Sequence, residues 1–279
     1  DFEITWLPLW KCNFKCPYCF GWTNTNGLEF QPITNLIRVW NIFFDKIHYS
    51  EFKVELIISG GEPTIYPNFF ELLKYFITKV SKVHVCTNLS FNASEFLNLK
   101  IPYDKISFNT TFHPTCISID KFLANLMLLK DYIKESVKFV ADENNLKNQE
   151  EIIKKINNCK LKAYPFFLKY LGQNSLKESN SNKKAYENME VLNSEDETNL
   201  IKKIRSNQNL TSSDYENGKA YSYGKKCFAG YKYIQIFPNG NIRKCSLDFE
   251  YLGNIFDNNI KIYTEPQLCK NKICPHQYH

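Results

Sequence analysis

Three cysteines near the start of the chain have the spacing of a metal-binding loop. Cys12, Cys16 and Cys19 form the pattern C-x3-C-x2-C directly after a short apolar segment. Three thiolates at this spacing can wrap one cuboidal iron–sulfur cluster and leave its fourth iron without a protein ligand. A structural zinc site needs four ligands, and no other Cys or His lies nearby in the sequence. The group therefore favours a cluster with one open iron, which can chelate a molecule through an amine and a carboxylate.

A second candidate site is the turn Ser59-Gly60-Gly61-Glu62-Pro63, which follows the apolar run Val54–Ile58. Glycines allow the backbone to approach a ligand closely, and the Glu62 carboxylate can accept a hydrogen bond from an ammonium group. Such a turn alone is more often structural than functional. At the carboxyl end of a predicted strand, where β/α barrels carry their active sites, it becomes a candidate ligand grip.

Four more cysteines form a group near the end of the chain. Cys227 is separated by twelve residues from Gly240, Cys245 follows after four more, and Cys269 and Cys274 complete the set. Four thiolates can hold either a structural zinc ion or a fully ligated iron–sulfur cluster. The spacing alone leaves both interpretations open.

The first two motifs together resemble the radical S-adenosylmethionine (SAM) superfamily, over about residues 3–168. The resemblance implies that the open iron binds the amino and carboxylate groups of SAM. It implies cofactor-binding roles for the following residues: Phe20, Gly60, Gly61, Glu62, Pro63 and, from weaker motifs, Asn88, Ser107 and Asn109. Ordinary polar strand ends explain the last three about as well.

The C-terminal cysteine spacing is similar to that of the twitch domain, the shorter relative of the SPASM domain in this superfamily. Leu252-Gly253-Asn254-Ile255 resembles the short segment that follows the hairpin in those domains. The resemblance implies a second, auxiliary [4Fe–4S] cluster held by Cys227, Cys245, Cys269 and Cys274. Such a cluster would carry electrons and would not bind substrate.

The resemblance also implies the reaction. Flavodoxin or ferredoxin reduces the first cluster, SAM is cleaved, and a 5′-deoxyadenosyl radical abstracts hydrogen from the substrate. The first hypothesis is oxidation or epimerisation of a small polar substrate such as a sugar or aminocyclitol. The alternatives are a ribosomal-peptide maturase, a lyase acting on a modified nucleoside, and a non-catalytic iron–sulfur electron carrier.

Three cysteines fall outside both groups. Cys86 and Cys159 read as small buried hydrophobic residues. Cys116 follows His113 in the segment Phe112-His113-Pro114-Thr115-Cys116, just past a predicted strand end. Cys116 could donate a hydrogen atom to a substrate radical or simply pack, and His113 could be a general base or a hydrogen-bonded loop residue.

Strand and helix patterns alternate about six times before residue 168, which predicts an α/β fold with a parallel sheet. The units are too few for an eight-stranded barrel, so we expect an open, partial (β/α)6 barrel. The expected barrel domain spans residues 1–219, with a mobile loop at 172–190 and a capped helix at 194–205. A β-hairpin with an Asn-Gly turn, at 233–245, opens a small cluster-binding domain at residues 220–279.

Composition narrows the function classes. The chain has 279 residues, of which 43% are hydrophobic, and a formal net charge of +6. Two anionic clusters would offset roughly three of these charges, so the basic balance is weak support for nucleic-acid binding. No apolar run is long enough to span a membrane and no signal peptide is evident. Seven cysteines in metal-type groups favour a reducing cytoplasm.

Overall fold

The structure is a computed structural model. It describes residues 1–16, 19, 30–47, 53–141, 148–167, 222–245, 248 and 250–271. Phe20, Cys274, the expected loop at 172–190 and the expected helix at 194–205 lie outside these residues.

A single sheet of ten strands forms the centre of the described structure, in the order β11-β10-β9-β8-β1-β2-β3-β4-β5-β6. The first six strands in the chain are parallel neighbours. Their bounds are β1 (Phe2–Trp6), β2 (Val54–Ile58), β3 (Lys82–Thr87), β4 (Ile106–Phe112), β5 (Ile133–Ala141) and β6 (Lys162–Phe167). The sheet does not close on itself, since β6 and β11 are its edges. The expected open (β/α)6 barrel is confirmed.

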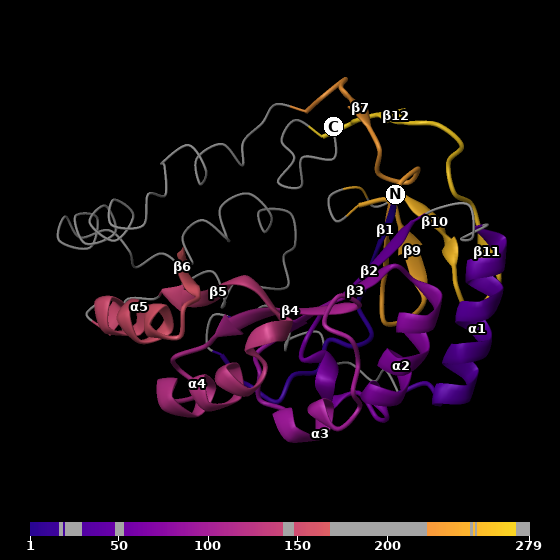
Figure 1. Cartoon of the computed structure of the whole chain (residues 1–279). Helices are drawn as coiled ribbons and strands as arrows, with labels where there is room; N and C mark the ends of the chain where they lie inside the picture. Colours follow the sequence, from indigo (N-terminus) through magenta and orange to yellow (C-terminus); the bar gives the residue numbers. More distant parts are fainter. Residues whose placement is uncertain are drawn as a thin grey trace.

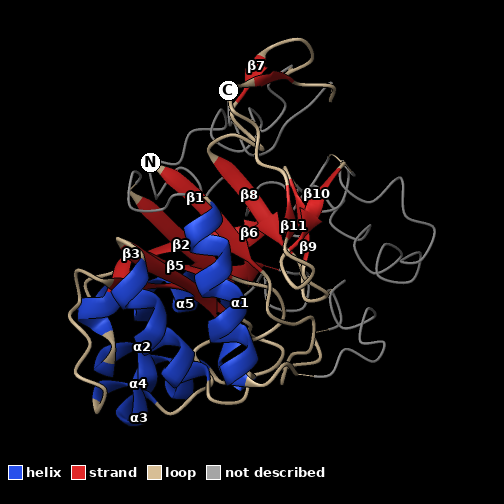
Figure 2. Cartoon of the chain, turned by 90° about the vertical axis from the view of Figure 1, so that its right-hand side faces the viewer, coloured by secondary structure: helices blue, strands red, loops and turns tan. Residues whose placement is uncertain are grey.

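The helices of the described residues cover one face of this sheet (Figures 1 and 2). They are α1 (Ile33–Lys46), α2 (Phe69–Lys79), α3 (Ala93–Leu97), α4 (Ile119–Leu128) and α5 (Gln149–Asn158), with the short 3-10 turns η3 (Pro63–Ile65) and η4 (Lys130–Tyr132). Helix α1 buries Leu36, Val39, Trp40, Phe43 and Phe44, the i, i+3, i+4 stripe of an amphipathic helix. No described helix is both long and apolar enough to cross a membrane.

The core lies between the helices and the sheet because each parallel strand presents alternate residues to the two faces. In β2, Val54, Leu56 and Ile58 are buried in this core, whereas Glu55 and Ile57 are partly exposed on the other face. Aromatic side chains in edge-to-face contact fill part of this core. Trp40 packs nearly perpendicular to Phe76, with ring centroids 5.0 Å apart. The face away from the helices is left for polar side chains.

The C-terminal strands extend the same sheet. Strand β8 (Tyr233–Ile236) pairs parallel to β1, and β9 (Asn241–Arg243), β10 (Tyr251–Asn254) and β11 (Asn259–Ile260) continue antiparallel from it. Strands β7 (Lys226–Cys227) and β12 (Gln267–Leu268) form a separate pair, at the top of Figure 1. The segment expected to form its own domain therefore contributes strands to the barrel sheet.

The predicted hairpin turn is confirmed at Gly240, which has φ +82°, a value that L-residues rarely adopt. Its N–H donates to the Phe237 carbonyl at 2.8 Å. A Cβ atom at Gly240 would lie 2.2 Å from the Phe256 ring and 2.6 Å from Asn254 Oδ1. The glycine of the C-terminal motif is thus required by both backbone angle and space.

Several bounds differ from those that the sequence pattern predicts. The apolar spacing over 119–133 predicts one continuous helix, whereas α4 ends at Leu128 and passes into η4, and β5 begins at Ile133. A 3-10 turn continues nearly the same apolar spacing as an α-helix, so the sequence pattern does not mark the change. The pattern also predicts a strand over 105–110, whereas β4 spans Ile106–Phe112.

Candidate active site

The glycine pair after β2 packs directly on the cysteine loop. The N–H of Gly61 donates to the Leu9 carbonyl at 3.0 Å, and the N–H of Glu62 donates to the Lys11 carbonyl at 3.1 Å. A Cβ at Gly60 would lie 2.4 Å from the Leu9 oxygen, and one at Gly61 would lie 2.0 Å from the Lys11 oxygen. The glycines therefore let two backbone segments touch, which fixes the start of the cysteine loop against the end of β2.

Glu62 is buried, with 1% of its surface exposed. One carboxylate oxygen accepts hydrogen bonds from the Thr64 hydroxyl at 2.6 Å, the Thr64 N–H at 3.2 Å and the Thr87 hydroxyl at 2.8 Å. The other accepts from the Asn88 N–H at 2.8 Å. Burial raises the pKa of Glu62, although these four donors favour the ionised form. The carboxylate thus ties the ends of β2 and β3 together.

Asn88 carries this connection on to the first cysteine. Its amide donates to Asn13 Oδ1 at 3.0 Å and lies 3.9 Å from Cys12 Sγ. Asn13 in turn donates to the Ser90 hydroxyl at 2.7 Å. Asn13 and Ser90 were not singled out from the sequence, because only the fold brings residues 77 positions apart into contact. The predicted residue Asn88 thus lies beside the cysteine loop, and its contact with SAM stays a prediction.

The three cysteines of the first group lie in one region. Cys16 and Cys19 share a small cluster, and the Phe14 N–H donates to Cys12 Sγ at 3.3 Å. Burial, followed by the nearby Glu62 carboxylate and the Cys19 thiol, raises the pKa of Cys12 above its usual value. A bound metal reverses this effect because a coordinated thiol is deprotonated.

This donor set fits an iron–sulfur cluster. The loop supplies three thiols and one backbone N–H that already faces a sulfur atom, and N–H donors to sulfur are a regular feature of cluster sites. Within the described residues, no three His, Cys, Asp or Glu side chains converge on a point that would hold a single metal ion.

His113 and Cys116 face the same sulfur atom. Cys16 Sγ lies 3.6 Å from His113 Nδ1 and 3.4 Å from Cys116 Sγ. The edge of the Phe14 ring packs on His113, with centroids 6.2 Å apart, and Val140 of β5 covers Cys16. Burial lowers the pKa of His113 to about 4. The hydrogen-donor role of Cys116 and the base role of His113 stay predictions.

Ser107 and Asn109 lie on the polar face of β4. Strand β4 spans Ile106–Phe112, so Ser107 lies near the start of the strand and away from its carboxyl end. Its hydroxyl lies 2.7 Å from His84 Nδ1, and His84 Nε2 lies 3.3 Å from Glu55. Asn109 contacts Cys86 on β3. Ser107 is therefore engaged in a cross-strand network, and SAM contacts from both residues stay predictions.

The described cysteines of the second group also come together. Cys227 and Cys269 are buried and pack with Cys245, Ala229 and Tyr233. The fourth member, Cys274, lies outside the described residues. The β7–β12 pair brings Cys227 and Cys269 close, since the Cys269 N–H donates to the Lys225 carbonyl at 2.9 Å.

The two cysteine groups lie at opposite ends of the parallel strands β1 and β8. The first follows the carboxyl end of β1, whereas Cys227 precedes β8, which runs parallel to β1. Strand β9 runs antiparallel to β8, so Cys245, which follows β9, lies at the same end of β8 as Cys227. The five residues of β1 separate these two ends, which is roughly 17 Å of extended chain. The polar face of the sheet lies between the groups.

A buried lysine supports the second group. Lys244 is 6% exposed, and its Nζ lies 2.6 Å from Asp248 and 3.7 Å from Glu250. Tyr263 donates to Glu250 at 2.5 Å. This network holds the chain on either side of Cys245 and places positive charge beside the cysteine group.

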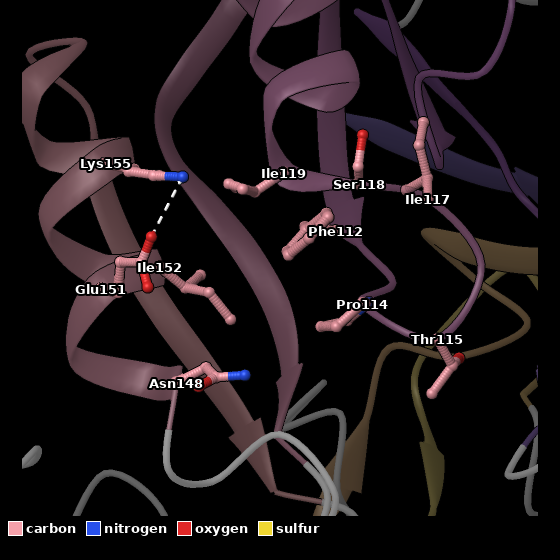
Figure 3. A pocket seen from close by; sticks show the side chains of 10 residues that line it. All are labelled: Phe112, Pro114, Thr115, Ile117, Ser118, Ile119, Asn148, Glu151, Ile152 and Lys155. Carbon is pink, nitrogen blue, oxygen red and sulfur yellow. Dashed lines mark ion pairs between the residues drawn. The ribbon is translucent and has the colours of Figure 1, made fainter.

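A cavity of about 430 Å3 opens between the N-terminal ends of α4 and α5. Phe112, Ile119 and Ile152 form its apolar wall, and the Lys155–Glu151 ion pair, at 3.1 Å, lies at its rim (Figure 3). Pro114 lines it too, so the turn that presents His113 and Cys116 to Cys16 borders the cavity.

The family model described as "Radical SAM superfamily" matches residues 10–193. The chain belongs to the radical SAM superfamily. It is therefore an enzyme of the class that uses SAM and a [4Fe–4S] cluster, as the C-x3-C-x2-C loop and the Gly-Gly-Glu-Pro turn predict.

A curated relative extends the similarity over nearly the whole chain. The "Antilisterial bacteriocin subtilosin biosynthesis protein AlbA" of Bacillus subtilis (strain 168) is 26% identical in an alignment 294 positions long that covers 96% of this chain. The chain spans 60% of the length of AlbA.

Two solved structures share the fold. Streptococcus suis SuiB, solved with its precursor peptide SuiA, has a TM-score of 0.59 and 14% identity, over 92% of this chain and 63% of SuiB. The enzyme anSMEcpe, solved with bound AdoMet, has a TM-score of 0.56 and 16% identity, over 92% of this chain and 76% of its own. At these identities the likeness is one of architecture: the partial barrel of a radical SAM enzyme.

Proposed function

We propose that this radical SAM enzyme modifies a ribosomally made peptide. The observation that carries the proposal is the similarity to AlbA, a bacteriocin biosynthesis protein, over 96% of the chain. Bacteriocins are antibacterial peptides, so the relative works on a peptide pathway. The sugar or aminocyclitol substrate expected first is not what this similarity favours.

In this proposal Cys12, Cys16 and Cys19 hold the first [4Fe–4S] cluster. The backbone around Gly60–Glu62 seats the amino group of SAM, because the Glu62 carboxylate is already engaged by four protein donors. When bound, the cluster and SAM supply a 5′-deoxyadenosyl radical that abstracts a hydrogen atom from the substrate. The protein positions the reacting C–H bond and excludes water and oxygen. The external electron donor is a flavodoxin or a ferredoxin.

The second group, Cys227, Cys245, Cys269 and Cys274, holds an auxiliary [4Fe–4S] cluster. Its place beyond the opposite end of β1, close to Tyr233 on the polar face, would let these cysteines hold a group that accepts one electron from the substrate radical while a proton leaves for solvent. The substrate then loses two hydrogen atoms in total: one to the deoxyadenosyl radical and one as an electron and a proton.

The cavity between α4 and α5 supports a substrate with side chains. An apolar wall with an ion pair at the rim suits one apolar side chain of a peptide, whereas a sugar requires many converging hydrogen-bonding groups.

The test is anaerobic reconstitution with iron, sulfide, dithionite and SAM. Peptides encoded beside the gene of this chain are compared with panels of sugars, aminocyclitols and nucleosides. We expect 5′-deoxyadenosine to form, and one peptide to lose the mass of two hydrogen atoms. Stimulation by a sugar or a nucleoside, and not by any peptide, would overturn the assignment. The matched variant Cys245→Ala should still form 5′-deoxyadenosine and fail to release the oxidised peptide.

A further inference from the structure

The turn after β4 is rigidly built. The Cys116 N–H donates to the His113 carbonyl at 3.0 Å, and the Ile117 N–H donates to the same oxygen at 3.3 Å. The turn is fixed at one end by Phe112, which packs against Phe122 of α4 with ring centroids 5.1 Å apart. At the other end Ser118 caps α4, since its hydroxyl accepts from the Lys121 N–H at 3.4 Å. The side chains of this turn therefore have little freedom to move.

The side chains of His113 and Cys116 both lie close to the sulfur atom of Cys16. His113 Nδ1 lies 3.6 Å and Cys116 Sγ lies 3.4 Å from Cys16 Sγ, distances that suit hydrogen bonds to a large sulfur atom. Phe14 packs on the imidazole, and Val140 covers the sulfur. Neither His113 nor Cys116 is among the residues that line the cavity between α4 and α5, so the turn points these two groups at the cysteine loop.

Hydrogen bonds to cluster thiolates change the reduction potential. A donor withdraws negative charge from the sulfur and favours the reduced state, which carries one more electron than the oxidised state. The effect is stronger where water is excluded, and Cys16 is only 5% exposed. Removing a donor should make the cluster harder to reduce.

We propose that His113 and Cys116 are positioning residues that donate hydrogen bonds to the Cys16 thiolate and thereby raise the reduction potential of the first cluster. The imidazole donates through Nδ1–H and the thiol through S–H. The inference rests on the proposed role of Cys16 as a ligand of that cluster. It gives the Phe112–Cys116 segment a task in electron uptake, separate from the hydrogen-donor and base roles considered from the sequence.

The experiment is a redox titration of the reconstituted full chain, followed by electron paramagnetic resonance. The first cluster is identified as the one whose signal changes when SAM is added. Four variants form two matched pairs: His113→Phe removes a donor and His113→Gln retains one, and Cys116→Ala removes a donor and Cys116→Ser retains one.

We expect His113→Phe to lower the ratio of reduced to oxidised first cluster about tenfold at a fixed potential, which is about 59 mV for one electron. His113→Gln should restore most of the wild-type value. Cys116→Ala should shift the potential in the same direction, and Cys116→Ser should not. The potential of the second cluster should be unchanged throughout.

A fully iron-loaded His113→Phe protein with the wild-type potential would overturn the inference. If that variant does not bind iron, the Cys116 pair decides, and equal potentials for its two members would overturn the thiol part. The outcome is distinguishable from failure of the proposed function. A potential shift without any peptide modification leaves the inference standing, whereas a first cysteine group that binds no SAM-responsive cluster removes the basis for both.

Discussion

The α-carbon of Gly61 lies so close to the carbonyl oxygen of Lys11 that a Cβ atom there would approach it to 2.0 Å. We therefore expect Gly61→Ala to displace the cysteine loop and prevent assembly of the first cluster. Iron and sulfide after reconstitution should fall by about half, since one of the two proposed clusters remains, and formation of 5′-deoxyadenosine should be lost. Gly224→Ala is the control, because a Cβ there meets nothing within 4 Å. Normal iron content in Gly61→Ala would contradict the packing argument.

Glu62→Gln should destabilise the fold and weaken SAM binding together. The glutamine amide would face donors from Thr64, Thr87 and Asn88, and leave at least one buried group without a partner. This costs about 1–3 kcal/mol. Thermal unfolding and SAM binding by equilibrium dialysis measure the two effects. Glu71→Gln, on the exposed side of α2, should change neither, and equal behaviour of the two variants would refute the role of Glu62.

Loss of the cluster in air should produce a disulfide between Cys16 and Cys116. Their sulfur atoms are 3.4 Å apart, and a disulfide forms with a small further approach to about 2 Å. Peptide mapping by mass spectrometry of air-exposed, metal-free protein should show this bridge in preference to any within the loop. Cys116→Ser should leave Cys16 open to alkylation. A bridge between Cys12 and Cys19 as the main product would show that the turn is placed differently.

Lys244→Met should destabilise the C-terminal strands far more than Lys155→Met does. The Lys244 side chain is 7% exposed and faces the Asp248 side chain, which is 13% exposed, so its removal leaves a largely buried carboxylate without its ion-pair partner at a cost of about 1–3 kcal/mol. The Lys155 side chain is 33% exposed and its partner Glu151 65%, and such pairs contribute little. Chemical denaturation of both variants checks the difference. Similar losses in the two would mean that burial of Lys244 does not matter.

Stability should fall in acid through Asp248. Its burial raises the pKa, but the Lys244 hydrogen bond and nearby charges outweigh this and hold the pKa below its usual value. A carboxyl group with a lowered folded-state pKa contributes stability above its unfolded pKa, about 4, and loses it as pH falls through the folded value. Asp248→Asn should therefore be less stable than wild type at pH 7, and the difference should disappear as pH falls through the lowered folded-state pKa of Asp248. A constant difference across this range would exclude the ionised pair as the cause.

The parallel sheet and most of its helices could be predicted because their signals are local. The apolar run Val54–Ile58 forms β2 with the predicted bounds, since it is short and a glycine turn ends it. The positions of the two cysteine groups at opposite ends of the strands could not be predicted. They depend on β8 pairing parallel to β1 across more than two hundred residues, and no local pattern encodes that pairing.

The residues of the site also divide into those that local motifs predict and those that only the tertiary fold brings together. The sequence motifs indicated Cys12, Gly61 and Glu62 correctly as neighbours. The motifs assigned the glycines to a ligand, whereas the structure adds a second reason for them: contact with the Leu9 and Lys11 carbonyls. The convergence of His113 and Cys116 on Cys16 is tertiary, because the contact joins residues 97 and 100 positions apart.

Strand β1 is bonded on one side to β2 and on the other to β8, so a single five-residue strand connects the surroundings of both cysteine groups. A cluster bound at one end would hold one end of this strand and thereby favour its pairing at the other end. The holoprotein should consequently melt in one cooperative transition, and depleting iron from either group should lower the melting temperature of the whole.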